Sequence, residues 1–190
     1  MTILAIRVVG DPVLRTPAEK VTRFDARLHR LVQDMHQTMD QVQGVGLAGP
    51  QVGSSLRLFV YHVGDERGTV CNPVLDLSPA AELPEDPGSE GCLSVPGLGF
   101  RLPRPAAVLL TGQDEHGEPL RIEAEGLLAR CFQHETDHLD GTLYIDKLQQ
   151  PERREAMAAL RDPRFAGHAG QVTAQRSTAV GSAFGLGVGA

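Results

Sequence analysis

The segment Gln133-His-Glu-Thr-Asp-His138 most constrains the fold and the chemistry of this chain, because it contains the pattern H-E-x-x-H. Histidines at positions i and i+4 lie one turn apart on the same face of a helix, so both imidazoles can reach a single metal ion. Glu135 is rotated by about 100° from His134 around the helix axis. It can therefore reach a water at that metal without being a ligand. The pattern alone leaves two alternatives open, a metal site or an ordinary helix with two surface histidines.

The surroundings of the motif favour the metal site. The spacing predicts a helix that follows Gly126 and ends near Gly141, whose residue type suits a left-handed C-terminal cap. One stripe of this helix holds Leu127, Cys131, His134 and His138, and the neighbouring stripe holds Leu128, Phe132, Glu135 and Leu139, whereas Gln133, Asp137 and Asp140 fall on the opposite side. The histidines and Glu135 thus face an apolar interior. An unpaired glutamate is costly there, and a metal site explains why it is tolerated.

A catalytic metal site usually needs a third protein ligand and one open position. The candidates after His138 are Asp140, Asp146, Glu152, Glu155 and His168, and none stands in a recognisable ligand motif. Upstream, Cys92 lies in Glu90-Gly-Cys-Leu-Ser94, where Gly91 lets the backbone approach an ion closely. The chain has only two further cysteines, Cys71 and Cys131, and an odd, sparse count does not make a disulfide framework.

Three segments resemble the signature motifs of peptide deformylases, in the same order and with similar spacing. They are G-V-G-L-A-G-P-Q (44–51), E-G-C-L-S (90–94) and Q-H-E-T-D-H-L-D-G (133–141). The likeness extends from the N-terminus to about Lys147. It implies an α+β fold with antiparallel β-sheets around a central helix bearing H-E-x-x-H. It also implies a metal-dependent hydrolase that removes the N-formyl group from the N-terminal methionine of new polypeptides and releases formate.

The resemblance also assigns roles to individual residues. Cys92, His134 and His138 would bind Fe²⁺, and Glu135 would act as general acid and base. Gln51 and the backbone N–H of Leu93 would stabilise the oxyanion, and Arg104 would pair with Glu90 behind the ligands. The residues expected around the bound peptide are Val45, Gly46, Glu90, Leu127, Arg130 and Cys131. For Arg130 a solvated helix charge is an equal alternative, and Cys131 fits either core or pocket wall.

Two departures from the family pattern and the identity of the metal qualify this assignment. Gly49 replaces the second alanine of the usual G-x-G-L-A-A-x-Q pattern, and Gly99 lies where some members carry an arginine. Fe²⁺ follows from the resemblance, whereas spacing alone favours Zn²⁺, which binds such sites more tightly. A purified sample is therefore expected to hold Fe²⁺, Zn²⁺, Ni²⁺ or Co²⁺.

The remaining chain predicts a single catalytic domain over residues 1–165. We expect a helix that starts near Thr22, a strand over 57–63, a loop over 78–91, a hairpin of strands 107–112 and 120–124, and a last helix over 152–161. Residues 166–190 are rich in Gly, Ala, Ser and Thr, which predicts a low-complexity, mobile tail.

The net charge of −6 argues against nucleic acid as a direct partner. No stretch approaches the roughly 18 apolar residues of a membrane span, and residues 1–9 do not resemble a signal peptide, so the cytoplasm is the expected compartment. The expected partners are N-formyl-methionyl peptides, as nascent chains near the ribosome exit. The rival functions are a zinc endopeptidase with its third ligand after His138, and an inactive member that only binds formylated peptides.

Overall fold

The computed structural model describes residues 2–77, 83, 88–165 and 167. Its larger sheet has five strands in the order β1-β2-β3-β6-β7, and every pair is antiparallel. The strands are β1 (Gly46–Ala48), β2 (Leu58–Val63), β3 (Glu66–Asp76), β6 (Ala107–Gln113) and β7 (Pro119–Glu125). A second antiparallel sheet pairs β4 (Ser89–Cys92) with β5 (Val95–Arg101).

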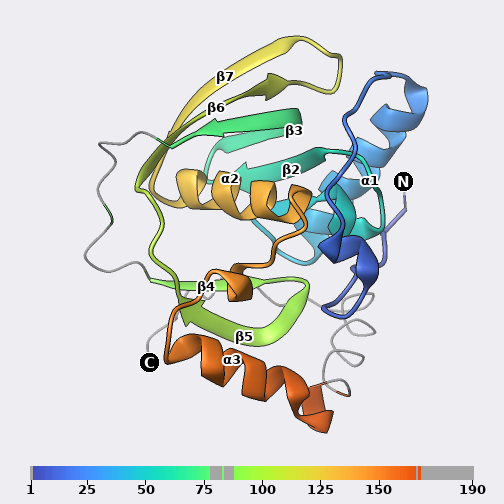
Figure 1. The fold of residues 1–190 in the computed structure, drawn as a ribbon. Helices are drawn as coiled ribbons and strands as arrows, with labels where there is room; N and C mark the ends of the chain where they lie inside the picture. Colours follow the sequence, from blue (N-terminus) through green and yellow to red (C-terminus); the bar gives the residue numbers. More distant parts are fainter. Residues whose placement is uncertain (1, 78–82, 84–87, 166, 168–190) are drawn as a thin grey trace.

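The named α-helices of the described residues are α1 (Ala26–Gln41), α2 (Gly126–Leu139) and α3 (Glu152–Arg161). Short 3-10 turns occur at η1 (Pro12–Arg15), η2 (Gly49–Val52) and η3 (Tyr144–Asp146). Figure 1 shows α2 between the five-stranded sheet and the β4–β5 sheet, with α3 on the far side of β5. The expected α+β class, with antiparallel sheets around a central helix, is confirmed.

Aromatic packing fixes α2 on the larger sheet. The ring of Phe132 lies 5.7 Å from that of Phe59 and 5.0 Å from that of Tyr61, both on β2. Such buried ring pairs contribute both apolar area and about 1 kcal/mol of specific contact energy each. Beyond the helix, Gly141 has φ +72°, and a Cβ there would meet the backbone of Arg15 at 2.9 Å. The chain can therefore turn sharply after α2, as the expected cap requires.

The structure corrects two expectations. The first helix does not start near Thr22 but at Ala26, because Asp25 is itself the N-cap and accepts from the N–H groups of Arg27 and Leu28. Residues 78–91 are not one loop, since Ser89 to Gly91 belong to β4, which pairs with β5. Residues 78–82 and 84–87 of that loop, and residues 166 and 168–190 of the expected tail, lie outside the described residues.

The other expected elements are present as β2, β6, β7, α2 and α3. None of the helices in the described ranges combines the length and the apolar character that a membrane-spanning segment requires.

Candidate metal centre

Three buried donors meet where β4 faces α2. The Sγ of Cys92, at the end of β4, lies 3.2 Å from Nε2 of His138. The ligand atoms of Cys92, His134 and His138 all lie within 4.8 Å of one another. A tetrahedral ion with a thiolate and two imidazoles would separate its sulfur and nitrogen donors by roughly 3.5 Å. One thiolate and two imidazoles suit a divalent transition metal, so the residues present fit the expected ion.

Glu90 fixes the orientation of the His134 ring. Its Oε1 lies 2.7 Å from Nδ1 of His134, which leaves Nε2 to face the other two donors. Arg104 donates to both oxygens of Glu90 at 2.7 Å. Burial alone would raise the pKa of Glu90, but the hydrogen bonds from His134 and Arg104 outweigh it and lower that pKa to about 2. Glu90 is therefore ionised at neutral pH, and the expected Glu90–Arg104 pair is present.

Glu135 is buried beside the three donors. Its Oε2 has no hydrogen-bond partner among the described residues. Burial raises the pKa of this carboxyl to about 7 in the metal-free protein. A carboxyl with this pKa exchanges a proton readily near neutral pH, which is the property that a general acid and base needs.

Gln51 presents its amide nitrogen to the same place. The backbone N–H of Ala48 donates to Oε1 of Gln51 at 2.8 Å, which fixes which end of the side-chain amide points inward. Its Nε2 then lies 3.3 Å from Oγ of Ser94 and 3.9 Å from Sγ of Cys92. Leu93, which follows Cys92 directly, is buried.

The departure at Gly49 has a structural reason. A Cβ on this residue would lie 2.6 Å from the carbonyl oxygen of Leu56. Glycine permits that close backbone approach, and so this chain has no room for the usual alanine unless the loop that carries Gln51 moves.

The edge strand β1 runs alongside Glu135. The N–H of His62 donates to the carbonyl of Val45, and Gly46 is opposite Tyr61 in the register. Because hydrogen-bonding directions alternate along an antiparallel strand, the N–H and C=O of Gly46 point away from β2, toward the edge of the sheet. This edge offers backbone groups that an extended peptide can pair with.

The other three expected peptide contacts lie on α2. Leu127 is 44% exposed, and Cys131 is fully buried with its thiol donating to the carbonyl of Val45 at 3.3 Å. Burial raises the pKa of the Cys131 thiol well above its usual value, so it stays protonated. The alternative of a solvated charge for Arg130 is wrong, because its Nη1 lies 3.4 Å from Oε2 of Glu90 and 3.3 Å from the carbonyl oxygen of Leu102.

Two site residues were missed from the sequence. Asp137 was placed on the side of the helix away from the interior, but that side is also covered, and the carboxylate pairs with Arg104 and Lys147. Lys147 lies after a sharp turn, in a stretch without a motif. Only the path of the chain beyond Gly141 brings it back to α2.

Replacing Gly46 with alanine should lower kcat/KM by at least about tenfold, because even a small displacement of a catalytic group slows the reaction by such a factor. The new Cβ would lie 2.8 Å from both Cδ of Glu135 and Sγ of Cys131, so Glu135 or β1 must move. Gly44→Ala is the control in the same segment. The nearest atom to its added Cβ would be Cδ1 of Leu93 at 3.3 Å, which is the end of a flexible side chain. Formate release from formyl-Met-Ala-Ser measures both. Equal rates for the two variants would contradict the close packing of β1 on Glu135.

Replacing Arg104 with methionine should destabilise the metal-free protein by about 3–5 kcal/mol, because the buried carboxylate of Glu90 would lose both of its hydrogen bonds from Arg104 and keep only His134 and the longer contact to Arg130. Urea unfolding measures this change. The matched control is Arg121→Met, which removes an exposed ion pair with Glu123 and should cost at most about 1 kcal/mol. Similar losses for both variants would show that the Glu90–Arg104 pair contributes no more than a surface pair.

Comparison with known proteins gives one consistent result. A family model described as polypeptide deformylase matches residues 3–154. The peptide deformylase of Acidothermus cellulolyticus is 53% identical over 167 residues, which cover 88% of this chain and 91% of that relative. The crystal structure of peptide deformylase from Thermus thermophilus has a TM-score of 0.79 at 43% identity and covers 88% of this chain and 99% of its own. A peptide deformylase from Synechococcus elongatus, solved in complex with actinonin, has a TM-score of 0.77 at 42% identity, with 87% and 88% covered.

Proposed function

The chain belongs to the polypeptide deformylase family, and from that membership we propose that Cys92, His134 and His138 hold its metal. The protein is a metal-dependent hydrolase that removes the N-formyl group from new polypeptides. The observation that carries the ligand assignment is the convergence of one cysteine from β4 and two histidines from α2 within 4.8 Å.

Fe²⁺ is the proposed metal. When bound, a divalent ion supplies a Lewis acid and a water of lowered pKa. The resemblance to iron-dependent deformylases supports Fe²⁺, whereas the usual affinity order favours Zn²⁺, Ni²⁺ or Co²⁺ in a purified sample. Cys92 must bind as a thiolate and both histidines as neutral imidazoles, so metal loading releases protons and weakens at low pH.

The proton transfers are assigned to Glu135. It takes a proton from the attacking water as the new C–O bond forms at the formyl carbon. It then delivers that proton to the methionine nitrogen as the C–N bond breaks, which releases formate and a free amine. Its burial and its pKa of about 7 support both roles.

The oxyanion that develops on the formyl oxygen is assigned to Gln51 and Leu93. The hydrogen bond from the N–H of Ala48 to Oε1 of Gln51 orients the side-chain amide so that Nε2 faces Cys92, and this orientation supports the role. The backbone N–H of Leu93 is the second proposed donor. One such donor typically stabilises the transition state by about 3 kcal/mol.

The peptide is proposed to extend along β1. The N–H and C=O of Gly46 would pair with its backbone, and the methionine side chain would lie among the remaining contacts. These are Val45, Glu90, Leu127, Arg130 and Cys131. As nascent formylated chains are the substrate, we place the enzyme in the cytoplasm near the ribosome exit, and we assign catalysis to residues 1–165.

The endopeptidase alternative needs a third ligand after His138. Among the described residues, no side chain after His138 joins the two histidines in a potential metal-binding group, which Cys92 completes instead. Asp140 pairs with Arg57 at 2.7 Å, and Asp146 pairs with Arg15. His168 lies outside the described residues. The binding-only alternative predicts bound metal without turnover.

The deciding experiment measures metal content and formate release together, on protein prepared without oxygen. The proposal expects one Fe²⁺ per chain and rapid deformylation of formyl-Met-Ala-Ser. Bound Fe²⁺ without formate release would favour the binding-only alternative, and full activity in metal-free protein would overturn the ligand assignment.

A further inference from the structure

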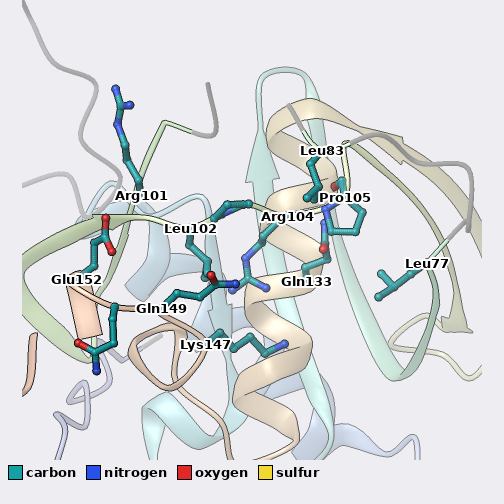
Figure 2. Close-up of a pocket in the computed structure, with 12 residues that line it drawn as sticks. Leu77, Leu83, Arg101, Leu102, Arg104, Pro105, Gln133, Lys147, Gln149 and Glu152 are labelled. Carbon is teal, nitrogen blue, oxygen red and sulfur yellow. Dashed lines mark hydrogen bonds between the residues drawn. The ribbon is translucent and has the colours of Figure 1, made fainter. Parts of the chain in front are cut away.

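The proposed mechanism leaves Asp137 and Lys147 without a role, although both are tied to the metal centre. Oδ1 of Asp137 accepts from Nζ of Lys147 at 2.5 Å, and Oδ2 accepts from Nη1 of Arg104 at 3.0 Å. Figure 2 shows the side chains of Arg104 and Lys147 both reaching α2, beside a cavity of about 550 Å³ that they help to line. Lys147 is 45% exposed there, whereas Arg104 is 5% exposed.

Contacts among four side chains form a closed chain that begins and ends on α2, called the ring below. Nδ1 of His134 contacts Oε1 of Glu90 at 2.7 Å, Glu90 accepts two bonds from Arg104 at 2.7 Å, and Arg104 donates to Asp137. His134 and Asp137 are three residues apart in the helix, so they lie on neighbouring turns. The ring therefore leaves α2 at His134 and returns to it at Asp137.

The ring also sets the position of Cys92. Glu90 and Cys92 are both in β4. Glu90 is held to α2 directly by His134 and Arg130, and indirectly through Arg104 and Asp137. The pairing of β4 with β5 is irregular between Gly91 and Cys92, yet both side chains face α2, because Glu90 contacts His134 and Cys92 contacts His138. Fixing the strand at Glu90 therefore restricts the position of Cys92, two residues further on. The distance between Cys92 Sγ and the two imidazoles then depends on every contact in the ring.

Lys147 supplies a second positive charge next to Asp137. Arg104 forms ion pairs with two carboxylates, those of Glu90 and Asp137. Within the described residues, the cations paired with Asp137 are Arg104 and Lys147. Without Lys147, Oδ1 of Asp137 would lose its cation and Arg104 would no longer be repelled by the ammonium group, so the guanidinium could shift toward Asp137 and away from Glu90.

We propose that Asp137 and Lys147 are positioning residues, which hold Cys92 and His134 at the separation that the metal needs. The inference rests on the proposed function, because it takes Cys92 and His134 as metal ligands. It predicts that a change at Lys147, which contacts no ligand, alters metal affinity and ligand geometry.

The test compares Lys147→Met with Lys147→Arg and with Lys20→Met, which changes the only other lysine of the chain. Three quantities are measured on each protein. They are the Zn²⁺ dissociation constant by chelator competition, the ligand-field spectrum after Co²⁺ loading, and the urea midpoint of the metal-free protein. Loss of an outer partner of a ligand costs 10–100-fold in metal affinity, so Lys147→Met should weaken Zn²⁺ binding by about tenfold and shift the Co²⁺ bands.

The two comparison variants isolate the charge. Lys147→Arg keeps a cation against Asp137 and should stay within about twofold of the wild-type dissociation constant, well below the loss expected for an outer partner. Lys20→Met should match the wild type in all three measurements. A lower urea midpoint for Lys147→Met with an unchanged dissociation constant and an unchanged Co²⁺ spectrum would overturn the inference, because Lys147 would then be only structural.

Asp137→Asn keeps the side-chain shape and should by itself weaken Zn²⁺ binding by about tenfold, so it tests the inference even if Lys147→Met does not fold; an unchanged Zn²⁺ dissociation constant would overturn the inference. If the ring acts as one unit, the Zn²⁺ dissociation constant of the Asp137→Asn/Lys147→Met double variant should not exceed that of whichever single variant binds Zn²⁺ more weakly. Independent residues would instead multiply their losses, which would also overturn the inference.

Failure of the inference is distinguishable from failure of the proposed function. Wild-type protein should bind one Co²⁺ with a thiolate charge-transfer band that Cys92→Ala removes. Absence of that band in the wild type would overturn the ligand assignment and, with it, this inference. Its presence, with Lys147→Met indistinguishable from the wild type, would overturn the positioning role alone.

Discussion

Glu135→Gln should lower the rate of formate release by roughly 10²–10⁴-fold while the metal content stays at the wild-type level. Glutamine has the shape of the glutamate and fits the same buried position, but it cannot accept the proton of the attacking water. The rate is measured with formyl-Met-Ala-Ser at saturating concentration, and metal content is measured on the same sample.

Glu123→Gln is the matched control, because Glu123 is exposed on β7 and pairs with Arg121, outside the metal centre. It should leave both quantities unchanged. If Glu135→Gln kept more than a tenth of the wild-type rate, another group would have to move the proton, and the role assigned to Glu135 would be wrong.

Cys92→Ala should abolish deformylation because the metal no longer stays bound. Loss of an outer partner of a ligand weakens metal binding by 10–100-fold, and loss of a ligand should exceed that, by more than roughly 100-fold. Chelator competition with Zn²⁺ measures the affinity directly.

The control for this variant is Cys71→Ala, which removes another buried cysteine from the core around α1 and β2. It should keep one metal ion per chain and near wild-type activity. A Cys92→Ala protein that retained its metal would sink the ligand set proposed here and would restore the endopeptidase alternative, in which a residue after His138 binds the ion.

Much of the site was predictable because helical spacing is a local property. His134, Glu135 and His138 needed only the period of the helix, and the stripe that contains Phe132 and Leu139 correctly predicted their burial. Cys92 was different, because its distance from α2 depends on how two sheets pack. Resemblance, not spacing, identified it, and the structure brings it to 3.2 Å from His138.

Four of the described strands, β1, β3, β4 and β5, were not predicted from the sequence, and β3 and β5 were missed for a physical reason. In β3 the register with β6 shifts between Cys71 and Val74, where Pro73 lies, and Asn72 has φ +54°. Proline cannot donate to a ladder and is tolerated at such irregularities, so the strand signal is weak there. β5 contains Gly97 and Gly99, which weaken strand propensity in the same way.

The contacts of Asp137 and Lys147 show a different limit. Charge pairing between distant residues depends on the whole path of the chain, here on the turn at Gly141 and on η3. Periodicity places Asp137 on a helix face but does not say what covers that face.

The placement of Cys92 on one sheet and of both histidines on the helix that packs against the other has a consequence for folding. A metal held by all three would join two layers that are otherwise connected by packing and by the ion pairs of Glu90 and Asp137. An ion that binds only the folded chain stabilises it by about 2.7 kcal/mol at a concentration 100 times its dissociation constant. The cellular supply of metal would then affect the stability of this protein as well as its activity, and a chelator would lower its free energy of unfolding.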